Sequence, residues 1–180
     1  MIHGTLLLDK PKNITSNRAL SIVKRKLSVK KAGIVGILDP LASGMLPIVL
    51  NEGTKLAKYI EPYEKEYQAV AKLGLISTTG DGEGVITKTE KGNPFKLTDI
   101  FIKNVLKDSI GKQKQTPPMY SGLKVNGVKL YDLARKGISI ERKSREINII
   151  DIKLISYKED ELCLNIIYLA KNSYFLPKLT

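Results

Sequence analysis

The stretch Gly33-Ile-Val-Gly-Ile-Leu-Asp-Pro-Leu-Ala-Ser-Gly-Met-Leu-Pro-Ile-Val-Leu50 places one carboxylate, Asp39, in an otherwise apolar segment that contains several glycines. Pro40 disfavours the α region for the residue before it, so we expect extended backbone at Asp39. Gly36 and Gly44 permit tight turns on either side. The surrounding apolar residues are expected to be buried, namely Leu38, Leu41, Met45, Leu46, Ile48, Val49 and Leu50. The stretch therefore predicts a loop, held by core on both flanks, that presents one acid.

The pattern leaves two interpretations of this loop open. A carboxylate fixed by its surroundings suits a reactive group, because it need not reorganise during a reaction. An Asp-Pro turn between two strands has the same pattern, and Asx turns are common.

The composition indicates a cytoplasmic globular protein. The chain has 180 residues, of which 42% are hydrophobic, and one cysteine. It has no apolar run of about 18 residues that would predict a transmembrane helix, and no signal-peptide pattern at its start. Cys163 cannot form an internal disulfide, and we expect it to be buried in a strand.

The charge of the chain predicts a polyanionic partner. The net charge is +12 and the pI is about 9.6, values that are typical of nucleic-acid-binding domains. The basic residues concentrate in residues 24–31 and 124–145. A lysine-rich composition can also reflect genome base composition or solubility.

The periodicity of the sequence predicts an α+β fold with a mixed, mostly antiparallel sheet flanked by helices, in a single domain over residues 1–180. Strands are expected at residues 5–8, 45–50, 67–75, 85–89, 147–155 and 162–169. Helices are expected at residues 15–27, 51–60, 97–110 and 129–136. Thr98 is the expected N-cap of the third helix and Gly111 its stop signal. Asn126-Gly127 predicts a hairpin turn.

The absence of several motifs limits the chemistry. There is no phosphate-binding glycine loop and no dinucleotide fingerprint. With His3 as the single histidine and Cys163 as the single cysteine, we expect no metal site and no histidine-based catalysis. Catalysis would then rest on a carboxylate, a tyrosine, a lysine or an arginine. One carboxylate without a cofactor suits chemistry at a glycosidic carbon or the removal of a proton.

Several ordered motifs resemble the TruB-type tRNA pseudouridine synthases. Residues 36–47 around Asp39, followed by Asn51-Glu-Gly-Thr-Lys55, are similar to the catalytic motif of that family. Further matches lie in Gly4-Thr-Leu-Leu-Leu-Asp-Lys-Pro11, in Lys65-Glu-Tyr-Gln-Ala69 and in Pro118-Met-Tyr-Ser-Gly-Leu-Lys124. The resemblance covers residues 4–170.

The resemblance implies that the protein isomerises uridine 55 in the T loop of tRNA to pseudouridine, without a cofactor or a metal. Asp39 aligns with the essential aspartate, which either adds to the sugar or removes a sugar proton. Tyr67 aligns with the tyrosine that stacks on the flipped-out base. Lys10 and Lys124 are expected to face substrate phosphates. The implied partner is the T-stem loop, and we expect a monomer.

Each of these assignments has a structural alternative. Tyr67 could be a cross-strand core aromatic, because tyrosine favours strands. Lys10 and Lys124 could be solvated surface lysines.

The chain also departs from the family pattern. Ile34 and Ile37 stand where the family has histidine and threonine. Tyr174 matches the second active-site tyrosine, but Leu176 replaces the arginine that pairs with the aspartate. The last elements of the catalytic domain and the C-terminal RNA-binding (PUA) domain are expected to be missing after Thr180. Loss of the cation should weaken the pre-organisation of a partly buried Asp39. The alternative function is therefore a truncated, non-catalytic remnant that only binds tRNA.

Overall fold

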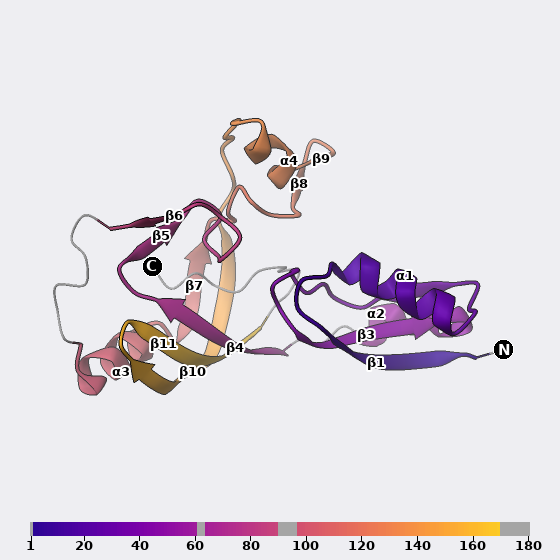
Figure 1. Ribbon diagram of the computed structural model, residues 1–180, viewed down its shortest axis with the longest axis horizontal. Coiled ribbons are helices and arrows are strands. Elements are labelled where there is room, and N and C mark those ends of the chain that lie inside the picture. The colour runs from indigo at the N-terminus through magenta and orange to yellow at the C-terminus, as the bar shows by residue number, and fades with distance from the viewer. Residues whose placement is uncertain (1, 61–63, 90–96, 170–180) are drawn as a thin grey trace. The chain divides into compact units, whose positions relative to one another are not determined.

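The computed structural model describes residues 2–60, 64–89 and 97–169 (Figure 1). The chain folds into two compact units, Met1–Pro62 and Tyr63–Thr180. Each unit has its own cluster of buried apolar side chains. That both units belong to one catalytic domain stays a prediction.

The first unit is a small antiparallel sheet with a helix packed on it. Its strands have the order β1-β3-β2, and its elements are β1 (Gly4–Lys10), α1 (Ser16–Lys26), β2 (Ala32–Ile34), β3 (Gly44–Leu50), η1 (Asn51–Leu56) and α2 (Ala57–Ile60). Val23 of α1 packs in one cluster with Ile48 and Leu50 of β3. The helix begins where the sequence predicts, because the Thr15 hydroxyl accepts a hydrogen bond from the Arg18 N–H.

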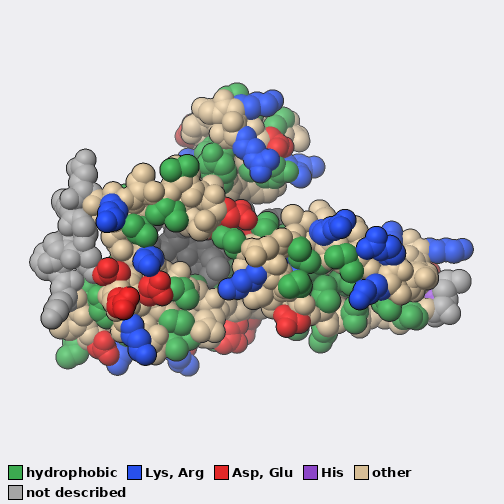
Figure 2. Space-filling view, in the orientation of Figure 1, with side chains coloured by type: hydrophobic (Ala, Val, Ile, Leu, Met, Phe, Trp, Pro, Cys, Tyr) green, Lys and Arg blue, Asp and Glu red, His purple; other side chains and the backbone are tan. Residues whose placement is uncertain are grey.

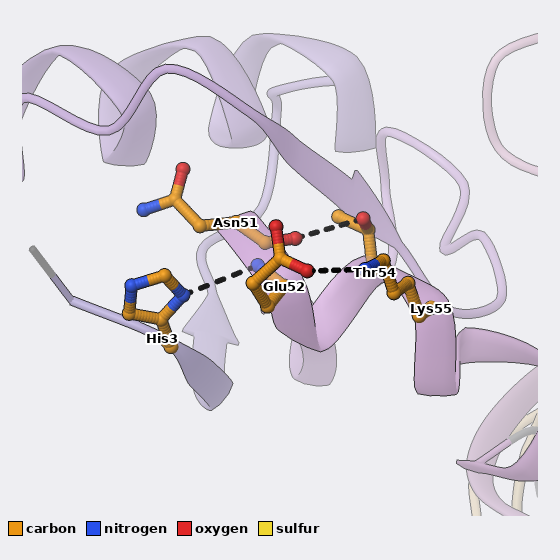
Figure 3. A network of polar contacts seen from close by, with 5 residues as sticks. All are labelled: His3, Asn51, Glu52, Thr54 and Lys55. Carbon is orange, nitrogen blue, oxygen red and sulfur yellow. Dashed lines mark hydrogen bonds and ion pairs between the residues drawn. The ribbon is translucent and has the colours of Figure 1, made fainter.

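Asn51 joins three segments of this unit. Figure 3 shows it at the start of η1, where its backbone carbonyl accepts from the Thr54 hydroxyl. Its φ angle is +48°, a value that asparagine tolerates better than most residues. Its side-chain NH₂ donates to the Ile2 carbonyl at 2.6 Å, and its side-chain oxygen accepts from the Lys31 N–H at 3.1 Å. The helix expected at residues 51–60 therefore begins at Asn51, first as the 3₁₀ helix η1 and then as α2.

The second unit contains a larger antiparallel sheet with the order β4-β11-β10-β7. Its elements are β4 (Glu64–Lys72), β5 (Leu75–Ser77), β6 (Ile86–Lys88), α3 (Asp99–Asp108), β7 (Gly111–Gln115), β8 (Lys124–Val125), β9 (Val128–Lys129), α4 (Leu130–Arg135), β10 (Arg145–Lys158) and β11 (Glu161–Leu169). From α3, Ile102 and Leu106 pack against the buried face of this sheet. Every strand pair among the described residues is antiparallel, which confirms the predicted α+β class.

Local signals in the second unit are confirmed in part. Thr98 caps α3 by accepting from the Phe101 N–H, and Asn126-Gly127, with φ angles of +51° and +80°, connects β8 to β9. The assignment of Gly111 as a helix stop is wrong: α3 ends at Asp108, and Gly111 begins β7. The strand expected at residues 67–75 ends earlier, at Lys72, because the chain turns at Gly74 (φ +74°).

Among the described residues, no helix combines the length and the apolar character that crossing a membrane requires.

Gly53 provides a test of the first unit. A Cβ atom there would lie 2.5 Å from the carbonyl oxygen of Gly4, so backbone would have to shift. We expect Gly53→Ala to lower the free energy of unfolding by about 1–3 kcal/mol, measured by urea denaturation. In the control Gly33→Ala, the new Cβ meets only the Val49 side chain, at 3.4 Å. Equal stability of the two variants would contradict the close packing of η1 on β1.

Candidate active site

Asp39 lies in the loop of residues 35–43, which joins β2 to β3. The Ala42 N–H donates to the Asp39 carbonyl at 3.1 Å, so Asp39 opens a turn with Pro40 in its second position. Gly36 adopts a φ of +79° at the other end of the loop. The Asp-Pro turn is thus present, and it presents an exposed Asp39. The turn and the reactive-acid interpretations are compatible.

Ser16 fixes the residue before Asp39. Its hydroxyl donates to the Leu38 carbonyl at 2.8 Å and accepts from the Leu38 N–H at 3.0 Å. Ser16 is 4% exposed, so water competes little for these bonds. One side chain at the start of α1 therefore satisfies both backbone groups of Leu38.

Lys10 fixes the residue after Asp39. The side chain is fully buried, and its ammonium donates to the carbonyls of Pro11 and Ile14, each at 2.9 Å, and of Pro40 at 3.4 Å. Burial lowers the pKa of the Lys10 ammonium, and the negative charge of Asp39 opposes that change. The Asn13 N–H donates to the Pro40 carbonyl as well, at 2.7 Å.

Both neighbours of Asp39 are therefore bonded to the same segment, residues 10–16, while Asp39 is exposed. A bonded backbone on each side restricts the loop, and the exposed carboxylate can meet a ligand from solvent. This is the arrangement that a pre-organised reactive acid requires.

Several burial expectations for this region are wrong. Lys10 is not a surface residue, because backbone carbonyls replace water around its ammonium. Met45 and Leu41 are 64% and 38% exposed, since both lie on the outer side of their segment, whereas Leu46, Ile48, Val49 and Leu50 are buried as predicted. Asp39 is exposed rather than partly buried.

Tyr67 lies in the second unit, on β4. It is half-buried and packs against the core of that unit. Its ring stacks on the Tyr168 ring with a centroid distance of 5.9 Å and an interplanar angle of 20°. The core-aromatic interpretation therefore describes its packing, and its expected role in stacking on a base stays a prediction.

Lys124 lies on β8, exposed, in register with Lys129 of β9. The Lys129 ammonium donates to the Tyr131 hydroxyl at 2.9 Å, and the Arg135 guanidinium lies 5.5 Å from the centroid of the Tyr131 ring. On the face shown in Figure 2, basic side chains gather over this hairpin with α4 and over α1. The basic residues of α1 are Arg18 and, in its last turn, Lys24, Arg25 and Lys26.

Four other residues were singled out from the sequence, and two of them lie among the described residues. Tyr174 and Leu176 lie outside the described residues. Ile34 is half-buried in β2, and Ile37 is 52% exposed in the loop. Within residues 2–60, 64–89 and 97–169, no three acidic, histidine or cysteine side chains gather as a metal site would require.

Ser16 was missed as a site residue by sequence reasoning. The sequence does contain a signal, because Thr15 and Ser16 are adjacent hydroxyl residues and only one of them can be the N-cap. Thr15 is the cap, which leaves the Ser16 hydroxyl for the loop.

The fold resembles parts of two larger solved structures. The chain matches a structure described as a Cbf5-Nop10-Gar1 complex with a TM-score of 0.66 and 24% identity, over 95% of this chain and 41% of that one. It matches an H/ACA RNP bound to a substrate RNA containing 2′-deoxyuridine with a TM-score of 0.64 and 20% identity, over 95% and 39% of the two chains. At these identities the likeness shows the fold.

Sequence comparison identifies the family. A model described as TruB family pseudouridylate synthase (N terminal domain) matches residues 24–174, so the chain belongs to this family. It is 44% identical over 173 residues to tRNA pseudouridine synthase B of Nitrosococcus oceani, covering 96% of this chain and 55% of that protein. It is 45% identical to the protein of the same name from Buchnera aphidicola, covering 96% and 54%. The chain spans about half the length of these curated relatives.

Replacing Ser16 by alanine tests its contact with the loop. Ser16→Ala leaves two backbone groups of Leu38 without their partner, so we expect a loss of about 1–3 kcal/mol in the free energy of unfolding and faster hydrogen exchange at the Leu38 N–H. Ser21→Ala is the control, because the hydroxyl of this exposed serine donates to the Asn17 carbonyl within the same helix. Its effect should stay within about 0.5 kcal/mol. Unchanged exchange at Leu38 in Ser16→Ala would contradict the contact.

Lys10→Met tests the buried ammonium, since methionine keeps an unbranched side chain without the charge. The carbonyls of Pro11, Ile14 and Pro40 lose their donor, which should cost about 1–3 kcal/mol at neutral pH.

The pKa of Lys10 is lower in the folded state than its ordinary value of 10.5, so the unfolded chain binds more protons between these two values. Wild type should therefore gain stability relative to Lys10→Met as the pH rises toward 10.5. Denaturation series at several alkaline pH values measure the difference in unfolding free energy between wild type and Lys10→Met. A difference that does not shift in favour of wild type as the pH rises would contradict the lowered pKa of Lys10.

Proposed function

We propose that this chain converts uridine 55 in the T loop of tRNA to pseudouridine, with Asp39 as the catalytic carboxylate. The observation that carries the proposal is the exposed Asp39 whose two neighbours are bonded to residues 10–16 through Ser16 and Lys10. Membership of the TruB family supports the reaction class. Because the relatives are about twice as long, the activity of this chain by itself is part of the proposal.

The reaction needs one carboxylate and no change of oxidation state. The bond between N1 of uracil and C1′ of ribose breaks, the base turns, and a bond forms between C5 and C1′. The C5 hydrogen leaves as a proton and N1 ends protonated, so substrate and product are isomers. An aspartate with a reference pKa of about 3.9 is ionised at neutral pH. In that form Asp39 either adds to C1′ or removes a sugar proton.

The base must leave its stack to reach an acid on the protein surface. Aromatic side chains replace part of the stacking that such a base loses, and Tyr67 is the residue proposed for this role, with Tyr174 as the second tyrosine. Lys124 is exposed on its hairpin and is proposed to contact phosphates of the RNA. Lys10 acts instead through the loop, because its ammonium is buried among carbonyls.

A tRNA-binding remnant without catalysis is the alternative. Leu176 stands where the family has the arginine that pairs with the aspartate, so this position does not supply a cation. The net charge of +12 would still bind RNA, with an affinity that falls as the salt concentration rises.

The two functions are separated by incubating the purified chain with unmodified tRNA labelled with tritium at C5 of uridine. Because C5 loses its hydrogen during isomerisation, turnover releases tritium. We expect release from wild type and a decrease on the order of 10³-fold in Asp39→Asn. Asp108→Asn, which changes an exposed acid at the end of α3, is the matched control and should keep wild-type turnover. Salt-dependent binding without release in wild type would support the remnant and contradict the enzyme.

A further inference from the structure

Tyr168 lies in the core of the second unit directly against Tyr67. It is 1% exposed and pairs through β11 with Lys65 of β4, two residues from Tyr67. Residues two apart on a strand point to the same face, so Tyr67 and Tyr168 are diagonal neighbours on one face of adjacent strands. The parallel offset of their rings, 5.9 Å between centroids at 20°, is a favourable aromatic arrangement.

The two rings differ in exposure. Tyr168 is enclosed by apolar side chains that include Ile149 and Ile166, whereas Tyr67 is half-buried. A ring fixed in a close-packed core has few alternative rotamers. The enclosed ring therefore limits the orientations that the partly exposed ring can adopt.

Tyr168 is itself linked to the next strands of the sheet. Arg145 begins β10, and burial lowers the pKa of its guanidinium, a change that the nearby Tyr168 side chain opposes. The Arg145 guanidinium donates to the Gln115 side-chain oxygen at 2.9 Å, and the two residues are in register between β10 and β7. Tyr168 is in register with Ile149 of β10, so β11, which carries it, is paired on one side with β4 and on the other with β10.

We propose that Tyr168 is a positioning residue, which holds the Tyr67 ring in the plane that receives the flipped-out uracil. This inference rests on the proposed function for the role of Tyr67 and adds a residue that acts only through that ring. Tyr168 itself is too buried to touch RNA. Its effect should fall on the step after the RNA has bound, because phosphate contacts elsewhere supply most of the affinity.

Kinetics of two variants of the full chain test the role. Tyr168→Leu removes the ring, and we expect kcat to fall about two- to tenfold while KM for tRNA changes less than twofold. Tyr168→Phe keeps the stacked ring and should recover wild-type kcat. Leu106→Ala is the matched control, because it destabilises the same core from α3 without removing an aromatic contact. An unchanged kcat in Tyr168→Leu, or an equal fall in Leu106→Ala at a temperature where both are folded, overturns the proposal.

A spectroscopic measurement distinguishes failure of this inference from failure of the proposed function. The chain is labelled with 3-fluorotyrosine, and the ¹⁹F resonance of Tyr67 is assigned by its loss in Tyr67→Phe. We expect Tyr168→Leu to move this resonance toward the position of the free amino acid, and Tyr168→Phe and Leu106→Ala to leave it near its wild-type position. If wild type shows no turnover, the proposed function fails, but the resonance still reports whether Tyr168 holds Tyr67. A Tyr67 resonance that is insensitive to Tyr168→Leu overturns the inference.

Discussion

The buried ammonium of Lys10 is the interaction on which the candidate active site depends. Removing a charge from water is costly unless hydrogen bonds and opposite charge replace the lost hydration. Here the replacement comes from the carbonyls of Pro11, Ile14 and Pro40 and from the nearby charge of Asp39. These groups belong to the entry of α1 and to the Asp39 loop, so the cost of burying one lysine is offset only when the two segments are together. The Ser16 hydroxyl adds a second connection on the other side of Asp39. A loop tied at both neighbours of its acid needs little reorganisation before reaction.

Sequence reasoning predicted what depends on local pattern. Strands β1, β3, β4, β10 and β11 follow from apolar periodicity, whereas the short strands β2 and β7 were not predicted. The cap Thr98 and the Asn126-Gly127 turn follow from the chemistry of single side chains. Burial of Lys10 could not be predicted in this way, because lysine normally indicates solvent and one of its acceptors lies thirty residues away in the chain, at Pro40. The exposure of Met45 was missed because an apolar run does not show which of its residues face outward. Gly111 was misassigned because a glycine after a helix can end that helix or begin a strand.

The candidate functional residues lie in two units, and a different kind of interaction fixes them in each unit. In the first unit, polar contacts to backbone groups fix the loop around Asp39. In the second unit, Tyr67 is held by packing, with Tyr168 against its ring and the core below. The match to the TruB family extends over residues 24–174 and includes Asp39 of the first unit and Tyr67 and Tyr168 of the second. The chain spans about half the length of the relatives that it matches. The function proposed for this chain by itself requires that the Asp39 loop is ordered here.

Backbone ¹⁵N relaxation at Leu38, Asp39 and Ala42 answers that question most directly. If Lys10 and Ser16 fix the loop as described, the order parameters of these amides should equal those of β3, at about 0.85. Values below about 0.6 at Leu38 and Asp39, with β3 still ordered, would show a loop that moves freely on the nanosecond timescale and would contradict the account of a pre-organised Asp39.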